Sequence, residues 1–435
     1  HTSLRANERK RKVLEMFTEV RLPDPERAYH AYPHELSGGQ KQRVIIAMAL
    51  ICNPVLLIAD EPTTALDVSV QKTIVELLKS LQKKYNMAMI FITHDLSLAA
   101  EIASRIVVMK QGEIVESGRV EEVFEHPQSA YTKGLLACRP GLGAPLSRLP
   151  VVSDFEANQT QNYTRRMPRT YIENEPALMR VQNLCKSFPL GSGWFGNQTF
   201  IQALNDVSFD VYKNETLGIV GESGCGKSTL GRCIARLIQP DSGEILYDGK
   251  SALDLKAKGL IDYRKDVQIV FQDPYSSLNP RQTIGNAISE PMLVHSELSR
   301  KEVVEKAKDL LEKVGLERGH FARYPHEFSG GQRQRIGIAR ALAVAPKVII
   351  CDESVSALDV SVQAQVLNLL SDLKEEYGLS YLFISHDLAV VRHMSDRILV
   401  MNQGRIEELG LVEDVYARPT SDYTKMLLEA IPGIQ

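Results

Sequence analysis

The sequence predicts an α/β protein that contains two related copies of one domain, each built on a parallel β-sheet covered by helices. Short apolar segments without polar alternation, such as 348–351 (VIIC), follow helical segments along the chain, which is typical of buried parallel strands. Positions 32–71 and 324–363 share 25 of 40 residues without a gap, at an offset of 292. This unit is far longer than a solenoid repeat, so the similarity indicates domain duplication.

The composition is that of an ordinary globular protein. The 435 residues, of which 44% are hydrophobic and 24% charged, are enough for two or three domains with their own cores. A formal net charge of -3 provides no general attraction for nucleic acid. The six cysteines show no CxxC pair and no metal-ligand spacing, which fits a reducing compartment. No apolar segment reaches the roughly 18–20 residues that a membrane-spanning helix needs.

The first copy is expected to alternate helices with apolar strands. We predict helices over 7–20, 40–51 and 69–84, strands over 55–59 and 88–93, and a hairpin of strands 106–109 and 113–116. Residues 139–176 change character, because they hold five prolines and little periodicity. We interpret them as a poorly ordered linker, with the second domain over 177–435.

The second copy contains a phosphate-binding motif in the required context. Residues 221–229 (GESGCGKST) match G-x-x-x-x-G-K-[ST], follow the predicted strand 216–220 and precede a helix. The main-chain N–H groups of such a loop surround phosphates, and the helix N-terminus adds its dipole. The predicted ATP-binding residues of this loop are Gly221, Glu222, Ser223, Gly224, Cys225, Gly226, Lys227, Ser228 and Thr229. We expect Lys227 to reach the β- and γ-phosphates and Ser228 to bind Mg²⁺.

Acidic and polar side chains follow the other predicted strands of this copy. Asp352 and Glu353 end the strand 348–352, Gln272 follows the strand 267–271, and His386 follows the strand 381–385. We expect Asp352 to hold Mg²⁺ and Glu353 to polarise the attacking water, since phosphoryl transfer depends on positioning and electrostatics. Gln272 is expected to contact the metal and the water, and His386 to donate a hydrogen bond to the γ-phosphate.

These motifs resemble the ATP-binding-cassette (ABC) ATPases, and the resemblance covers both copies apart from the linker. It implies the P-loop NTPase cassette fold, with an α/β core, a helical subdomain between Gln272 and the second signature, and an antiparallel β subdomain near 203–211. It also implies that cassettes pair head to tail, so that the P-loop of one and the S-G-G-Q signature of the other enclose each ATP. The signature residues are Ser37, Gly38, Gly39 and Gln40 in the first copy, and Ser329, Gly330, Gly331 and Gln332 in the second.

The resemblance also implies an aromatic residue that stacks on adenine upstream of the P-loop. Phe188 is the assigned residue, Phe200 is an alternative, and a role in core packing is open for either.

The first copy lacks a counterpart of residues 178–292. The chain opens on His1, in the middle of the pattern that the second copy shows in full. We therefore expect residues 1–138 to be the C-terminal part of a first cassette without its P-loop, in an N-terminally truncated chain.

Within the family, residues 271–285 (FQDPYSSLNPRQTIG) and the tails around Tyr131 and Tyr423 resemble the ATPases of peptide and nickel importers. Two cassettes joined by a proline-rich linker are similar to the fused members that import glutathione. The resemblance implies an ATP-hydrolysing subunit, peripheral on the cytoplasmic face of the inner membrane, that drives uptake of peptides or glutathione-like small peptides. The implied partners are two integral-membrane permeases and, indirectly, a solute-binding protein, with no nucleic acid.

Two alternatives are open at this point. An ABC ATPase that acts on ribosomes or DNA would carry long coiled-coil arms, zinc-binding cysteines or basic tails, and none is visible in the sequence. A fragment that does not hydrolyse ATP is the other alternative, because the first copy lacks a P-loop.

Overall fold

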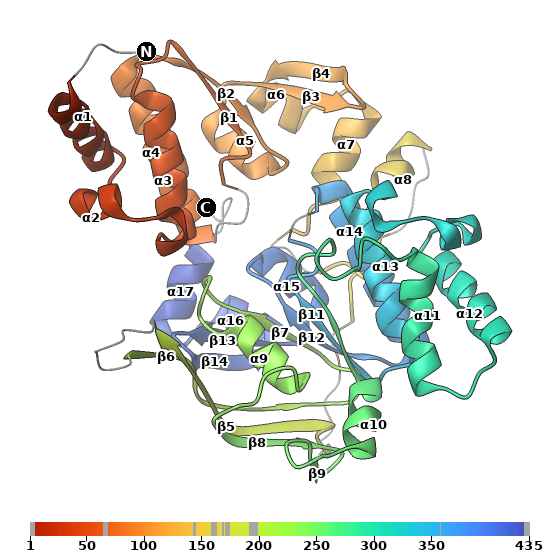
Figure 1. The fold of residues 1–435 in the computed structure, drawn as a ribbon. Coiled ribbons are helices and arrows are strands. Elements are labelled where there is room, and N and C mark those ends of the chain that lie inside the picture. Colours follow the sequence, from red (N-terminus) through yellow and green to blue (C-terminus); the bar gives the residue numbers. More distant parts are fainter. Residues whose placement is uncertain are drawn as a thin grey trace. The chain divides into compact units, whose positions relative to one another are not determined.

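The computed structural model describes residues 5–63, 68–141, 145–157, 163–167, 169, 175–190, 199–356 and 358–429. Contacts divide these residues into two units, the first ending at Thr132 and the second running from Lys133 to Glu429 (Figure 1). Helix α7 (Ala130–Ala137) spans this division. No helix among the described residues has both the length and the apolar character needed to span a bilayer.

The second unit is built on a six-stranded sheet in the order β10-β11-β12-β7-β13-β14. All neighbours are parallel except the pair β13 and β14. Every residue of β7, β11 and β12 is buried, as the unbroken apolar pattern predicts. The strands are β7 (Thr216–Val220), β10 (Val267–Val270), β11 (Val348–Asp352), β12 (Ser380–Ile384), β13 (Arg397–Asn402) and β14 (Arg405–Leu411).

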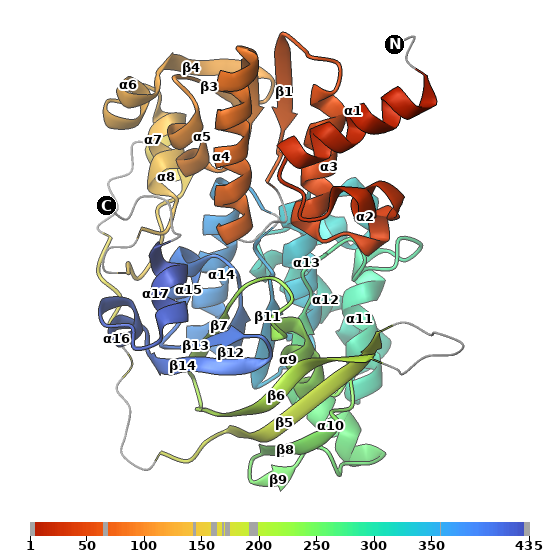
Figure 2. The same ribbon diagram turned by 90° about the vertical axis from the view of Figure 1, so that its left-hand side faces the viewer.

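A second, antiparallel sheet of this unit has the strand order β6-β5-β8-β9. Its strands are β5 (Met179–Leu190), β6 (Thr199–Val211), β8 (Ser242–Tyr247) and β9 (Lys250–Ser251). This sheet confirms the antiparallel β subdomain that the resemblance implies near 203–211. In Figure 2 its long strands β5 and β6 run side by side.

The helical subdomain between Gln272 and the second signature is also confirmed. It contains α11 (Ile284–His295), α12 (Arg300–Lys313), η2 (Arg318–Ala322) and η3 (Pro325–Glu327), followed by the signature helix α13 (Gly330–Leu342). The other helices of this unit are α8 (Val152–Glu156), α9 (Lys227–Ile234), α10 (Lys258–Asp266), α14 (Val360–Tyr377), α15 (Leu388–Met394), α16 (Val412–Ala417) and α17 (Asp422–Glu429).

The first unit repeats part of this architecture. Its strands β1 (Leu56–Asp60) and β2 (Ala88–Ile92) are parallel, and β3 (Arg105–Lys110) and β4 (Glu113–Arg119) form the predicted hairpin. Its helices are α1 (Ala6–Glu19), α2 (Pro25–His30), η1 (Pro33–Glu35), α3 (Gly38–Leu50), α4 (Val68–Tyr85), α5 (Leu96–Ile102) and α6 (Val120–Glu125).

Burial differs between equivalent strands of the two units. Ile58 on β1 is 61% exposed, whereas its counterpart Ile350 on β11 is fully buried. In the second unit, α9 covers this position, because a Cβ added at Gly231 would lie 3.2 Å from Ile350 Cγ2. The same apolar sequence pattern is therefore half-exposed in the two-stranded sheet and enclosed in the six-stranded sheet.

The described part of the linker differs from the expected poorly ordered segment. Leu149 N donates to Asn368 Oδ1 at 2.8 Å, and Asn368 Nδ2 donates back to Leu149 O at 2.8 Å. Asn368 lies on α14 and is buried, so this pair satisfies polar groups that would otherwise be costly to bury. The linker residues that the structure describes thus group with the second unit, while the boundaries at 138 and 176 stay a prediction.

The buried imidazole of His393 on α15 makes the stability of the second unit sensitive to acid. Burial, aided by the charge of Arg166, lowers the pKa of His393 to about 4, whereas an unfolded histidine titrates near pH 6.5. Between these values the unfolded chain binds a proton that the folded chain does not. The contribution of His393 to the free energy of unfolding is therefore fully present above pH 6.5 and is lost as the pH falls to 4. We expect this group to reduce the free energy of unfolding by up to about 1.4 kcal/mol per pH unit in that window.

Urea unfolding followed by circular dichroism at several pH values measures this effect. The control is His393→Gln, which cannot take up the proton and should show a shallower loss of stability between pH 6.5 and 4. Equal pH dependence of the two proteins would show that His393 does not contribute.

Candidate nucleotide-binding site

The loop after β7 has a backbone that only glycine tolerates. Gly221, Gly224 and Gly226 have positive φ angles of 148°, 81° and 109°. A Cβ at Gly221 would lie 2.1 Å from Met401 O, and one at Gly226 would lie 2.2 Å from Ala203 O. The glycines therefore allow the loop to curl closely between β13 and β6, with α9 beginning directly after it.

Lys227, the first residue of α9, is only 4% exposed and folds back over the loop. Its Nζ donates to Gly221 O at 2.6 Å and to Glu222 O at 2.9 Å, and it lies 3.7 Å from Cys225 Sγ. The ammonium group is thus held at the loop by main-chain carbonyls.

A contact that the sequence did not reveal comes from the C-terminal helix α17. Glu222 N donates to the Tyr423 hydroxyl at 3.2 Å. In the sequence, Tyr423 is notable only as part of a tail motif that is repeated around Tyr131. The contact between Glu222 and Tyr423 could not be predicted, because 201 positions separate the two residues.

The carboxylate of Asp352 lies next to the phosphate-binding loop. Ser228 Oγ donates to Asp352 Oδ1 at 2.7 Å, and Asp352 is almost completely buried at the end of β11. Burial raises the pKa of Asp352, although the hydrogen bond from Ser228 opposes this effect. A hydroxyl and a carboxylate are thereby brought together at one point.

Glu353, the next residue, is held by neighbours that follow two other strands. Gln272 Nε2 donates to Glu353 Oε2 at 2.8 Å, and His386 Nδ1 lies 3.5 Å from the same oxygen. Glu353 has a φ of 48°, and its N–H donates to Ile384 O at 3.0 Å, which turns the chain at the end of β11. The structure therefore brings together Glu353, Gln272 and His386, three of the four side chains that the sequence placed at strand ends.

The electrostatics of this pair favour the charged forms. Burial acts to raise the pKa of Glu353, but the hydrogen bonds with His386 and Ser356 and the charges of His386 and Lys227 together lower it. Burial acts to lower the pKa of His386, but the hydrogen bond with Glu353 and the charges of Glu353 and Asp387 together raise it.

The residues present fit a nucleoside triphosphate with Mg²⁺. Mg²⁺ in nucleotide sites takes one or two carboxylates with hydroxyls, waters and the phosphates of the substrate. Ser228 and Asp352 provide such a donor pair, and Gln272 is hydrogen-bonded to Glu353, the residue that follows Asp352. Among the described residues no group of three or more His, Cys, Asp or Glu side chains is arranged to hold a metal ion.

The two signatures form the same local structure in their respective units. Ser37 Oγ accepts from Gln40 N at 3.3 Å and Ser37 N donates to Gln40 Oε1 at 3.0 Å, and Ser329 with Gln332 repeats both bonds at 3.4 and 3.0 Å. Each serine is therefore the N-cap of its helix, α3 or α13, in a capping box. The first unit also repeats the acid–histidine pair, with His94 Nδ1 3.1 Å from Glu61 Oε1.

Both candidate adenine-stacking residues lie on the antiparallel sheet. Phe188 on β5 pairs with Ile201 on β6, the residue that directly follows Phe200. Both phenylalanines are exposed, and Lys186 Nζ lies 5.5 Å from the centroid of the Phe188 ring. The structure does not place either ring in the core, and the assignment of Phe188 to adenine stays a prediction.

Strand β7, the glycine loop and helix α9, with the buried acid Asp352 at the end of β11 in the same sheet, define a P-loop ATPase. Comparison with known proteins narrows this class. The profile "ABC transporter" matches residues 1–64 and 204–356, and the profile "Oligopeptide/dipeptide transporter, C-terminal region" matches residues 115–164.

The chain is 52% identical over 424 residues to the glutathione import ATP-binding protein GsiA of Escherichia coli O157:H7, covering 96% of this chain and 67% of that protein. It is 49% identical over 425 residues to the protein of the same name from Pectobacterium atrosepticum, covering 97% and 68%. A solved ATP-binding cassette dimer, in a post-hydrolysis state with ADP and Pi, is 31% identical with a TM-score of 0.49, covering 54% of this chain and 98% of that chain. The chain belongs to the ABC transporter ATPase family, as its motifs predicted, and the predicted cassette fold is confirmed.

Gly331 of the second signature is required for close packing of α13 on α14. A Cβ at Gly331 would lie 2.2 Å from Val362 Cγ1, and the β-branched valine has little freedom to move away. We expect Gly331→Ala to destabilise the second unit by about 1–3 kcal/mol, which is typical of overpacking. Thermal unfolding followed by circular dichroism measures this loss.

The matched control is Gly337→Ala in the same helix, where an added Cβ meets no atom within 4 Å. Alanine has the higher helix propensity, so Gly337→Ala should be neutral or slightly stabilising. Equal stability of the two variants would contradict the packing role of Gly331.

Proposed function

We propose that this chain is the ATP-hydrolysing subunit of an importer for peptides or glutathione-like small peptides. The observation that carries the proposal is the convergence of Lys227, Asp352 and Glu353 at one edge of the buried sheet, with Gln272 and His386 hydrogen-bonded or ion-paired to Glu353. The family supports ATP as the substrate. The oligopeptide/dipeptide transporter profile and the name of the relatives support peptide-like cargo.

The chain's own residues have separate roles in hydrolysis. Lys227, held by the carbonyls of the loop, offers its positive charge to the β- and γ-phosphates. Ser228, Asp352 and Gln272 would hold Mg²⁺, which would neutralise charge on the phosphates. Glu353 orients the attacking water and accepts its proton, and His386 donates a hydrogen bond toward the γ-phosphate.

The signatures complete ATP sites in this proposal. Ser37, Gly38, Gly39 and Gln40 serve the P-loop of the second cassette, while Ser329, Gly330, Gly331 and Gln332 serve the P-loop of the cassette paired with it. A capped helix start with glycine N–H groups binds anions, which supports a contact with the γ-phosphate.

The chain acts through partners in this proposal. Two integral-membrane permeases bind the helical subdomain, and a solute-binding protein delivers the cargo to the permeases. The chain is thereby peripheral on the cytoplasmic face of the inner membrane. ATP closes the paired cassettes, and hydrolysis reopens them.

Replacing Glu353 with glutamine tests the assigned base. Glu353→Gln preserves the size of the side chain but removes the charge that accepts the proton from water. We expect phosphate release to fall at least about a hundredfold, while binding of a fluorescent ATP analogue changes by less than about threefold. Steady-state hydrolysis at the wild-type rate in Glu353→Gln would reject the assignment.

Two equivalent serines test which signature completes the site in this chain. Ser37→Ala and Ser329→Ala each remove the same N-cap, with an expected cost of about 1 kcal/mol. Only Ser37 is proposed to face the P-loop at Lys227, so Ser37→Ala should lower ATP hydrolysis more than Ser329→Ala. Equal loss in both variants, measured as phosphate release, would argue against head-to-tail pairing within the chain.

A further inference from the structure

The described part of the linker folds back on itself and fixes the backbone of Arg166. Leu146 and Arg165 form an antiparallel bridge, and Arg166 N donates to Pro145 O at 2.8 Å. The guanidinium group of Arg166 therefore extends from an anchored segment of the linker.

This guanidinium group binds the end of helix α15. Arg166 Nη1 donates to His393 O at 2.7 Å and to Ser395 O at 3.1 Å, and its Nη2 pairs with the carboxylate of Asp396. A cation at a helix C-terminus satisfies carbonyls that have no partner within the helix and interacts favourably with the helix dipole. One linker side chain thus fixes both α15 and the start of β13.

Helix α15 connects this contact to the ATP site. Its N-cap, Asp387, directly follows His386 and accepts from Ala389 N at 2.9 Å and Val390 N at 3.2 Å. The helix has seven residues and so spans about 10 Å. A shift of its C-terminal end is therefore transmitted to His386, because a short capped helix moves as one body.

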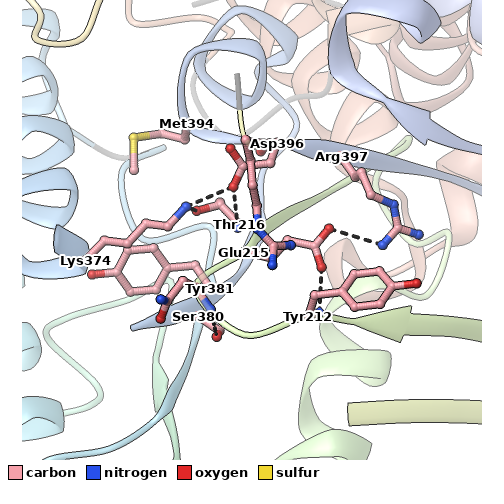
Figure 3. Close-up of polar contacts among 12 residues, drawn as sticks. Tyr212, Glu215, Thr216, Lys374, Ser380, Tyr381, Met394, Asp396 and Arg397 are labelled. Carbon is pink, nitrogen blue, oxygen red and sulfur yellow. Dashed lines mark hydrogen bonds and ion pairs between the residues drawn. The ribbon is translucent and has the colours of Figure 1, made fainter. Parts of the chain in front are cut away.

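A second connection runs through Asp396, whose side chain is 5% exposed. Its Oδ2 accepts from Thr216 N at 2.8 Å and from Lys374 Nζ at 2.9 Å, and Lys374 also donates to Thr216 Oγ1 at 2.8 Å (Figure 3). Thr216 is the first residue of β7, and the strand leads directly into the phosphate-binding loop. The carboxylate that pairs with Arg166 therefore holds the start of the strand whose other end leads into the loop before Lys227.

We propose that Arg166 is a positioning residue for ATP hydrolysis in the second cassette. From the linker, it fixes α15 and the start of β7, and through them it sets the geometry of His386 against Glu353. The inference rests on the proposed function, since it assigns a role at the same ATP site. It also makes the linker between the cassettes a part of the hydrolytic machinery.

The first experiment compares Arg166→Ala, Arg166→Lys and the wild-type chain in ATP hydrolysis. We expect Arg166→Ala to lower kcat about tenfold with KM for ATP changed less than twofold, because small displacements of positioned groups slow the reacting step. Arg166→Lys keeps the charge beside Asp396 and should recover part of the loss. An unchanged kcat in folded Arg166→Ala, or a rise in KM alone, would overturn the proposal.

The matched control is Arg148→Ala. Arg148 is another linker arginine, and its exposed side chain pairs with Asp372 of α14 at 3.1 Å. Its removal loosens the linker but leaves α15 capped, so kcat should stay at the wild-type value. A tenfold loss in Arg148→Ala as well would show that linker docking in general, and not Arg166, is needed.

A double-mutant cycle tests whether Arg166 acts through His386. The expected kcat of Arg166→Ala/His386→Ala equals that of His386→Ala alone, since removal of the histidine already removes what Arg166 positions. If the kcat loss of the double variant equals the product of the two single-variant losses, the two residues act independently, and the route through α15 is refuted.

A measurement without ATP separates failure of this inference from failure of the proposed function. In histidine-selective NMR spectra, assigned with His386→Gln, the imidazole signal of His386 should shift in Arg166→Ala and stay in place in Arg148→Ala. If the wild-type chain does not hydrolyse ATP, the proposed function fails, whereas an unmoved His386 signal in Arg166→Ala rejects the positioning role itself.

Discussion

The parallel register of β7, β11 and β12 is the constraint on which the site depends. The Cα of Asp352 pairs with that of Ile384, and Ile384 pairs with Ile219 of β7, so three strands end at one edge of the sheet. Each strand is buried throughout, so it cannot slip without leaving main-chain groups unsatisfied. The loop at Gly221, the acids and His386 are consequently brought within reach of one another by residues that take no part in the chemistry.

The internal duplication separates what local sequence determines from what packing determines. Ser37 and Ser329 form matching capping boxes, and the turns at Glu61 and Glu353 have similar φ angles of 44° and 48°. These features recur although the surrounding sheets differ in size. Burial does not recur, as Ile58 and Ile350 illustrate. Local motifs are therefore set by a few adjacent residues, whereas the core depends on which elements are present to cover it.

The same distinction explains how much could be predicted from the sequence. The apolar strands, the glycine loop, the hairpin of the first unit and the strand-end acids depend on local patterns, and the structure places them as expected. The bonds from Tyr423 to Glu222 and from Asn368 to Leu149 join residues 201 and 219 positions apart, and no local pattern marks them. The proline content of the linker predicted poor order. Composition carries no information on the surface that a segment contacts, so it could not predict that Leu149 binds Asn368.

The cysteine inside the phosphate-binding loop has a consequence for redox chemistry. Cys225 lies beside the ammonium group of Lys227, a position that would ordinarily favour a reactive thiolate. Burial has the larger effect and raises the pKa of the thiol, so the group stays protonated near neutral pH. The loop therefore carries a sulfur atom next to the ammonium group of Lys227 without becoming a ready target for oxidants or alkylating agents.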